Sequence, residues 1–100
     1  MLIKQGVVMC FLNDQIRTAL AVIQEVYEGL LEEPVCTAGC DGNHKVNSKH
    51  YVNDAVDLRL PHKDNIPLIV AQLKAKLGSK FYVLLEVDHI HVQYGQPTVI

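Results

Sequence analysis

The segment KFYVLLEVDHIHVQYG, residues 80–95, has the strongest strand pattern of the chain. Its first part, residues 80–87, is almost continuously apolar, which is typical of a buried strand. Its second part, residues 89–95, alternates apolar and polar side chains and closes on a glycine. No glycine lies between the two parts to force a tight turn, so the pattern leaves open a hairpin or one bent strand.

The alternation also brings two histidines together. Residues two apart on a strand point the same way, so His89 and His91 are predicted to face one cleft, while Ile90 and Val92 face the core. A pair of imidazoles on one strand face is weak evidence for a metal site, because such pairs occur by chance. Other ligands have to come from elsewhere in the chain.

Two segments before this one predict helices. Residues 13–31 begin with the capping residues Asn13 and Asp14 and repeat apolar side chains at helical spacing. A second helix is predicted to begin at Asp64 or Asn65, with a proline in its first turn, and to end before the next glycine.

Two further strands are predicted, at residues 35–38 and 54–60. The second alternates strictly, which directs Asp57 and Arg59 outward or into a cleft. The apolar run at residues 6–12 is predicted to be buried. This order of elements indicates an α+β fold, with a small antiparallel sheet and helices packed on one side, and one compact domain over residues 1–100.

Composition narrows the function. The chain has 100 residues, 49% of them hydrophobic and 20% charged, with a net charge of -2, which describes an ordinary folded protein. Nothing in this balance indicates a nucleic-acid partner. No apolar run approaches the roughly 18 to 20 residues that a membrane helix requires, and no secretion signal is evident. We therefore expect a soluble protein, cytoplasmic on synthesis, without membrane partners.

The three cysteines, Cys10, Cys36 and Cys40, are an odd number, which argues against a disulfide framework. The spacing of Cys36 and Cys40 leaves a shared metal site open. Buried, unreactive thiols are the favoured interpretation, because cysteine is among the most buried residue types.

A metal-ligand set can be assembled from distant parts of the chain. His50 lies in a polar loop, and Asp57 follows seven residues later on a strand. Catalytic zinc typically takes three protein ligands from histidine and carboxylate side chains and leaves a fourth position to water. His50, Asp57 and one of the two late histidines would make such a set.

Two motifs resemble a known family. The stretch SKHYVNDAVD, residues 48–57, resembles the S-x-H-x-x-G-x-A-x-D signature of the zinc D-alanyl-D-alanine carboxypeptidases, and DHIH, residues 88–91, resembles their acid-then-H-x-H signature. That family includes phage L-alanyl-D-glutamate endopeptidases and shares its fold with the hedgehog signalling domain. The resemblance covers Thr37 to Tyr94 and implies a hedgehog/DD-peptidase-like fold.

Carried over by position, the resemblance implies one zinc ion per chain with His50, Asp57 and His91 as ligands. Asp88 matches the general base. His89 matches a histidine beside the metal that helps to stabilise the reacting carbonyl.

The remaining positions include a match and two departures. Ser48 matches the motif serine, expected to orient the ligand loop from outside the ligand set. The motif glycine is Asn53 here, which is tolerable because asparagine enters the left-handed region with little penalty. Many members also carry an arginine that contacts substrate in the segment matching residues 37–44, and this chain has none there. His44, Lys45 and Arg59 are the candidates to replace it.

Alternatives remain for the acid and for the isolated histidines. Glu86 also lies three residues before a histidine, so a shifted assignment would make Glu86 the base and His89 the ligand. In an ideal strand Asp88 would point away from His91, so we expect the strand to begin after Asp88 or to be bulged there. His44 and His62 each have a plain alternative as solvated loop histidines.

Together these features predict a zinc metallopeptidase that cuts the stem peptide of peptidoglycan, either as a carboxypeptidase or as an endolysin-type endopeptidase of phage. The expected partner is the cell-wall peptide, and the protein is expected to be a monomer. The alternative is a non-catalytic, zinc-stabilised interaction module with the same fold.

Overall fold

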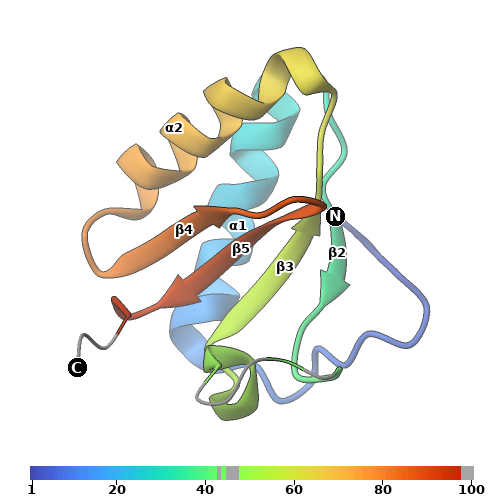
Figure 1. The fold of residues 1–100 in the computed structure, drawn as a ribbon, viewed down its shortest axis with the longest axis vertical. Coiled ribbons are helices and arrows are strands. Elements are labelled where there is room, and N and C mark those ends of the chain that lie inside the picture. The colour runs from blue at the N-terminus through green and yellow to red at the C-terminus, as the bar shows by residue number, and fades with distance from the viewer. Residues whose placement is uncertain (43, 45–47, 98–100) are drawn as a thin grey trace.

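The computed structural model describes residues 1–42, 44 and 48–97. In this part of the chain, a five-stranded sheet in the order β1-β2-β3-β5-β4 packs against two α-helices (Figure 1). The strands are β1 (Leu2–Ile3), β2 (Val35–Ala38), β3 (Ala55–Arg59), β4 (Phe81–Leu85) and β5 (His89–Tyr94).

The last two strands form the antiparallel hairpin that the sequence left open. β4 and β5 pair along their lengths, and β5 pairs on its other side with β3, also antiparallel. β3 pairs antiparallel with β2. The centre of the sheet therefore follows the alternation seen in the sequence.

The prediction of a wholly antiparallel sheet is wrong at its edge. β1 pairs with β2 in parallel, so the sheet is mixed. Backbone hydrogen bonds from Leu2 to Pro34 and from Lys4 to Cys36, at 2.8 and 2.9 Å, hold this short strand. Two residues are too few to show a period in sequence, and their partner lies more than thirty positions away.

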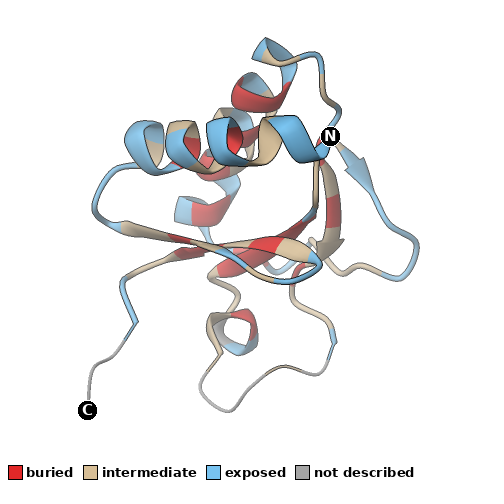
Figure 2. Ribbon diagram, turned by 45° about the horizontal axis from the view of Figure 1, so that its top comes forward, coloured by how far each residue is buried: buried red, intermediate tan, exposed pale blue. Residues whose placement is uncertain are grey.

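Both predicted helices are present, as α1 (Asp14–Gly29) and α2 (Ile66–Leu77), with the short 3₁₀ helix η2 (Lys63–Asn65) directly before α2. They cover the same side of the sheet (Figure 2). The core between helices and sheet consists of aliphatic side chains with one tyrosine, chiefly Ile16, Ile23, Val26, Tyr27, Val56, Leu58, Ile69, Leu73, Ile90 and Val92. None of the described helices has the length and apolarity to cross a membrane.

Two local predictions need correction. α1 ends two residues earlier than predicted, because Leu31 adopts a left-handed conformation with φ 57°. Leu31 is 97% exposed, so it does not join the apolar face of the helix. The apolar run at residues 6–12 is not a buried segment: Leu12 is buried, but Cys10 and Phe11 are exposed. The run crosses turns rather than a strand, so only part of it faces the core.

The helix-free side of the sheet is covered locally by described residues between β2 and β3. This region contains the 3₁₀ helix η1 (Lys49–Val52), which lies on the opposite side of the sheet from α1 and α2 (Figure 2). Asn53 closes η1 in the left-handed conformation, φ 65°, as its place in the motif predicted. Because this cover is present, Asp57 is 7% exposed although it belongs to the helix-free face.

Candidate metal centre

Strand pairing brings the first two candidate ligands together. In the β3–β5 ladder Asp57 lies directly opposite His91, and Arg59 lies opposite His89. Side chains opposite one another in an antiparallel pair share a face and lie close. His91 Nδ1 is 2.9 Å from Asp57 Oδ1.

η1 contributes His50 from the helix-free side of the sheet. The Ser48 hydroxyl accepts the backbone N–H of His50 at 3.2 Å, so this serine caps the turn that carries the histidine. His50 is 2% exposed, and its Nε2 lies 3.0 Å from the same Oδ1 atom of Asp57. His50, Asp57 and His91, which are distant in sequence, therefore meet at one carboxylate oxygen.

The second nitrogen of each ring fixes where its hydrogen lies. His50 Nδ1 is 2.8 Å from the carbonyl oxygen of Gly39, and His91 Nε2 is 2.7 Å from Gln93 Oε1. A carbonyl oxygen only accepts, so each of these nitrogens must carry hydrogen. In a neutral imidazole the other nitrogen then presents a lone pair, here toward the carboxylate of Asp57.

Such a convergence of acceptors needs positive charge. A divalent cation between the imidazole lone pairs and the carboxylate would supply that charge. Burial alone would raise the pKa of Asp57, but hydrogen bonds from His50 and His91 hold that pKa well below its usual range. Burial lowers the pKa of His91, and its hydrogen bonds to Asp57 and Gln93 outweigh burial, so the pKa is raised.

His44 belongs to the cluster and is not a solvated loop histidine. One donor atom each from His44, His50 and Asp57 lie within 4.8 Å of one another, so these residues could hold a metal ion. The ring of His44 stacks on that of His50, with centroids 3.8 Å apart and planes 9° from parallel. Its Nε2 lies 2.8 Å from the backbone oxygen of Asp41.

Ring orientation separates the two possible third ligands. The lone pair of an imidazole nitrogen lies in the ring plane, and zinc binds along it at about 2.0–2.1 Å. The nearly parallel planes of His44 and His50 share no point near an ion, so His44 would have to leave the stack to bind beside His50. The planes of His50 and His91 meet at 63°, so these rings are not stacked, but His91 lies outside the group of donor atoms within 4.8 Å of one another.

Asp88 and His89 lie beside the cluster. β5 begins at His89, so Asp88 stands in the preceding turn, as expected. Its side chain is 79% exposed, and its Oδ1 lies 2.6 Å from His89 Nδ1. His89 Nε2 is 3.7 Å from Asp57 Oδ1. Asp88 is thus connected to the carboxylate of Asp57 through one imidazole.

The other sequence candidates occupy different places. Arg59 is exposed at the end of β3, next to His89 across the strands. Glu86 donates its backbone N–H to the carbonyl of His89 in the hairpin turn. His62 is exposed and caps η2, as expected of a solvated histidine, whereas Lys45 lies outside the described residues. The shorter approach of His91 to Asp57 favours His91 over His89 as the ligand.

The cysteines stand apart from this cluster. Cys36 is fully buried, its Sγ lies 3.6 Å from Met9 Sδ, and burial raises its pKa to about 11. Within the described residues, the candidate metal group contains histidine and aspartate but no cysteine. The buried, unreactive interpretation therefore fits Cys36, but it is wrong for Cys10, which is exposed, and Cys40 is only partly buried.

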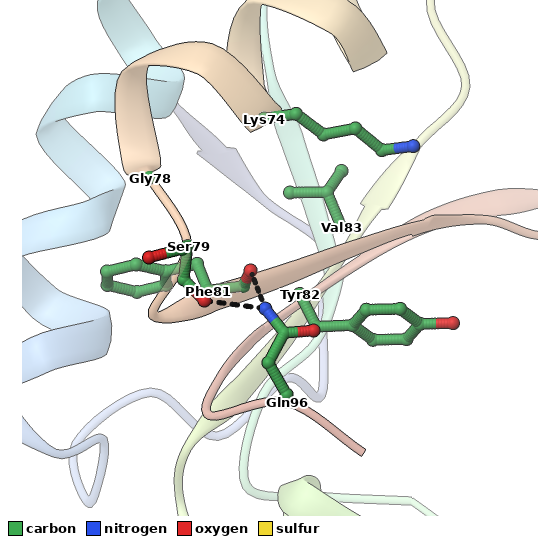
Figure 3. Close-up of a pocket in the computed structure, with 7 residues that line it drawn as sticks. All are labelled: Lys74, Gly78, Ser79, Phe81, Tyr82, Val83 and Gln96. Atoms are coloured by element: carbon green, nitrogen blue, oxygen red, sulfur yellow. Dashed lines mark hydrogen bonds between the residues drawn. The ribbon is translucent and has the colours of Figure 1, made fainter.

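A cavity of about 330 Å³ opens elsewhere, at the edge of the sheet where α2 turns into β4 (Figure 3). Its lining includes Lys74, Phe81, Tyr82, Val83 and Gln96, and none of the histidines. The Gln96 amide closes one side by donating to the backbone oxygens of Ser79 and Phe81. The cavity is therefore separate from the cluster of histidines around Asp57.

Two hydrogen-bond partners of the candidate ligands, Gln93 and the Gly39 carbonyl, were not predicted from the sequence. Gln93 could have been found, because it follows His91 by two positions on the same strand face. The Gly39 carbonyl carries no side-chain signal and depends on the fold of its loop. No protein-family model matches this chain, and no curated protein matches it.

Proposed function

We propose that this protein is a zinc metallopeptidase that hydrolyses the stem peptide of peptidoglycan. The observation that carries the proposal is the convergence of two imidazole nitrogens on one buried carboxylate oxygen, His50 at 3.0 Å and His91 at 2.9 Å from Asp57. The substrate class follows from the resemblance of residues 48–57 and 88–91 to the carboxypeptidase signatures.

The donor set suits zinc. Ligands bonded to zinc at about 2.0–2.1 Å in tetrahedral geometry lie roughly 3.3 Å from one another. The two contacts to Asp57 are within a few tenths of an ångström of that separation. His91 does not belong to the group of donor atoms within 4.8 Å of one another, so the two imidazole nitrogens would have to move closer together around an ion. Each histidine also gives its second nitrogen to a carbonyl oxygen, from Gly39 or Gln93, which is how metal-binding imidazoles are usually oriented.

Asp88 and His89 supply proton transfer and polar contact beside the ligands. Zinc, when bound, acts as a Lewis acid that activates water near neutral pH and polarises a carbonyl group. The exposed Asp88 carboxylate can accept a proton from the attacking water and return it to the leaving amine. His89 lies between Asp88 and Asp57, where its imidazole can donate to the oxygen of the reacting carbonyl.

Hydrolysis of purified peptidoglycan tests this proposal. The zinc-loaded protein is expected to release new peptide termini, and a chelator is expected to stop the release. Asp88→Ala should keep stoichiometric zinc while turnover falls by orders of magnitude, because the proposed base is removed without a ligand. Asp64→Ala is the matched control, since Asp64 also forms an exposed pair with a histidine, 3.6 Å from His62, in η2 and outside the cluster. Equal loss of zinc and turnover in Asp88→Ala would contradict the assigned role.

A second candidate is a zinc-stabilised interaction module without turnover. The favouring observation is that Asp88 contacts His89 and none of the three proposed ligands in the described structure. The same experiment separates the candidates. Chelation that lowers the melting temperature, with no peptide released from any cell-wall substrate, would support the module.

A further inference from the structure

Gln93 is a buried polar residue on the helix-free face of β5, two positions after His91. Only 7% of the Gln93 residue surface is exposed, and β5 is flanked there by β3 and β4. Both ends of its amide are engaged. Its Oε1 lies 2.7 Å from His91 Nε2, and its Nε2 donates to the carbonyl of Gly95 at 2.8 Å.

The Gly95 carbonyl determines which way this amide points. A carbonyl oxygen accepts and cannot donate, so the NH₂ end of Gln93 must face Gly95 and the oxygen end must face His91. Gly95 adopts φ +92°, a conformation open to glycine, and its N–H is bonded to Lys80 O. The end of β5 therefore fixes the acceptor that orients Gln93.

This orientation selects the metal-binding nitrogen of His91. Because Gln93 Oε1 requires a hydrogen on Nε2, a neutral His91 has its lone pair on Nδ1, the atom that faces Asp57. The opposite tautomer would place the N–H toward the carboxylate and leave Nε2 and Oε1 as two facing acceptors. That arrangement would occupy the ligand position with hydrogen and cost a buried hydrogen bond.

We propose that Gln93 is the positioning residue that selects Nδ1 of His91 as the ligand atom and thereby sets zinc affinity. The inference rests on the metal site of the proposed function, but not on turnover. Partners of this kind outside the ligand set typically contribute 10- to 100-fold in metal affinity. Among the hydrogen bonds of the described residues, the Gln93 amide oxygen is the one acceptor for the N–H at His91 Nε2.

Competition against a chromogenic chelator measures the effect on zinc affinity. Gln93→Met keeps similar bulk but removes the acceptor, so its dissociation constant is expected to rise about 10- to 100-fold. Gln93→Glu restores an acceptor for Nε2–H and should recover affinity relative to the methionine variant. Gln96→Met is the matched control, because Gln96 also donates to backbone carbonyls but lies at the β4 edge, and it should bind as wild type. Wild-type affinity in Gln93→Met, or no recovery in Gln93→Glu, would overturn the proposal.

The tautomer itself gives a test that does not depend on turnover. Ring ¹⁵N shifts of His91 in the zinc-loaded protein should show hydrogen on Nε2 and the ion on Nδ1 in the wild type. Gln93→Met should lose this preference, and the glutamate variant should regain it. An unchanged tautomer in the folded methionine variant would overturn the role of Gln93. If the zinc-loaded wild type released no peptide but its ligating nitrogen depended on Gln93, the proposed function would fail while the positioning role survived.

Discussion

Replacing Asp57 by asparagine should abolish zinc binding without unfolding the protein. The substitution preserves side-chain shape but removes the charge on which His50 and His91 converge. An amide can still donate to one imidazole lone pair and accept from the other ring. The zinc-free variant is therefore expected to stay within about 1–2 kcal/mol of wild type, since the buried charge is removed while the amide keeps a polar contact to each ring.

The size of the zinc effect follows from linkage. A ligand at 100 times its dissociation constant stabilises the folded state by about 2.7 kcal/mol. For a chain of 100 residues, each kcal/mol shifts the melting temperature by about 4–8 °C, so zinc should raise that of wild type by roughly 10–20 °C. Asp57→Asn should show almost no rise.

Scanning calorimetry with zinc and with excess chelator measures both quantities. Asp64→Asn, which changes an exposed aspartate beside His62, should respond to zinc as wild type does. A full thermal shift in Asp57→Asn would refute the reasoning, because it would place the ion on donors that do not include this carboxylate. A wild type that ignores zinc would refute the metal site as a whole.

Three further predictions concern the scaffold. Leu31→Gly should raise the free energy of unfolding by about 1 kcal/mol in urea titrations, because Leu31 combines φ 57° with an almost fully exposed side chain; Leu31→Ala, which keeps the strain, should give no such gain. Burial raises the pKa of Cys36 to about 11, so the stability that the neutral thiol contributes should be complete below about pH 9 and fall as pH rises toward 11. The free energy of unfolding should decline by at most about 1.4 kcal/mol per pH unit, and Cys36→Ala should flatten that decline. Leu58→Ala should cost about 2–5 kcal/mol of unfolding free energy because Leu58 is fully buried, whereas Leu68→Ala, at a half-exposed position, should cost less than about 1; equal costs would contradict the core assignment.

The elements with a strong period were predictable. α1 and α2 show helical spacing over several turns, and β3 and β5 alternate, so both helices and the central strands follow from local sequence. The same alternation placed His89 and His91 on one face, with Ile90 and Val92 in the core, where the structure has them. These predictions succeed because one face of each element must be buried.

Features that depend on distant partners were not predictable from the residues. The parallel pairing of β1 needs the edge offered by β2, and two residues carry no pattern of their own. The stack of His44 on His50 depends on the path of the loop between β2 and η1, and the Gly39 carbonyl on the same loop. The glycine at position 39 indicates only a lack of space for a side chain, because a Cβ there would lie 2.5 Å from Val8 O.

The gradient of exposure across the cluster bears on whether the site can turn over substrate. His50, which belongs to η1, and Asp57, which lies on the face that η1 covers, are almost completely buried, as ligands of structural metal sites are. Toward the beginning of β5, His89 is partly exposed and Asp88 is largely exposed, and Arg59 lies exposed opposite His89. A purely structural zinc site is enclosed by its ligands, whereas a catalytic site keeps one side open to water and substrate. The groups capable of proton transfer and of pairing with a carboxylate stand on the exposed side. In the peptidase that we propose, a peptide would therefore approach Asp57 past Asp88, His89 and Arg59, whereas the alternative interaction module gives this exposure no role.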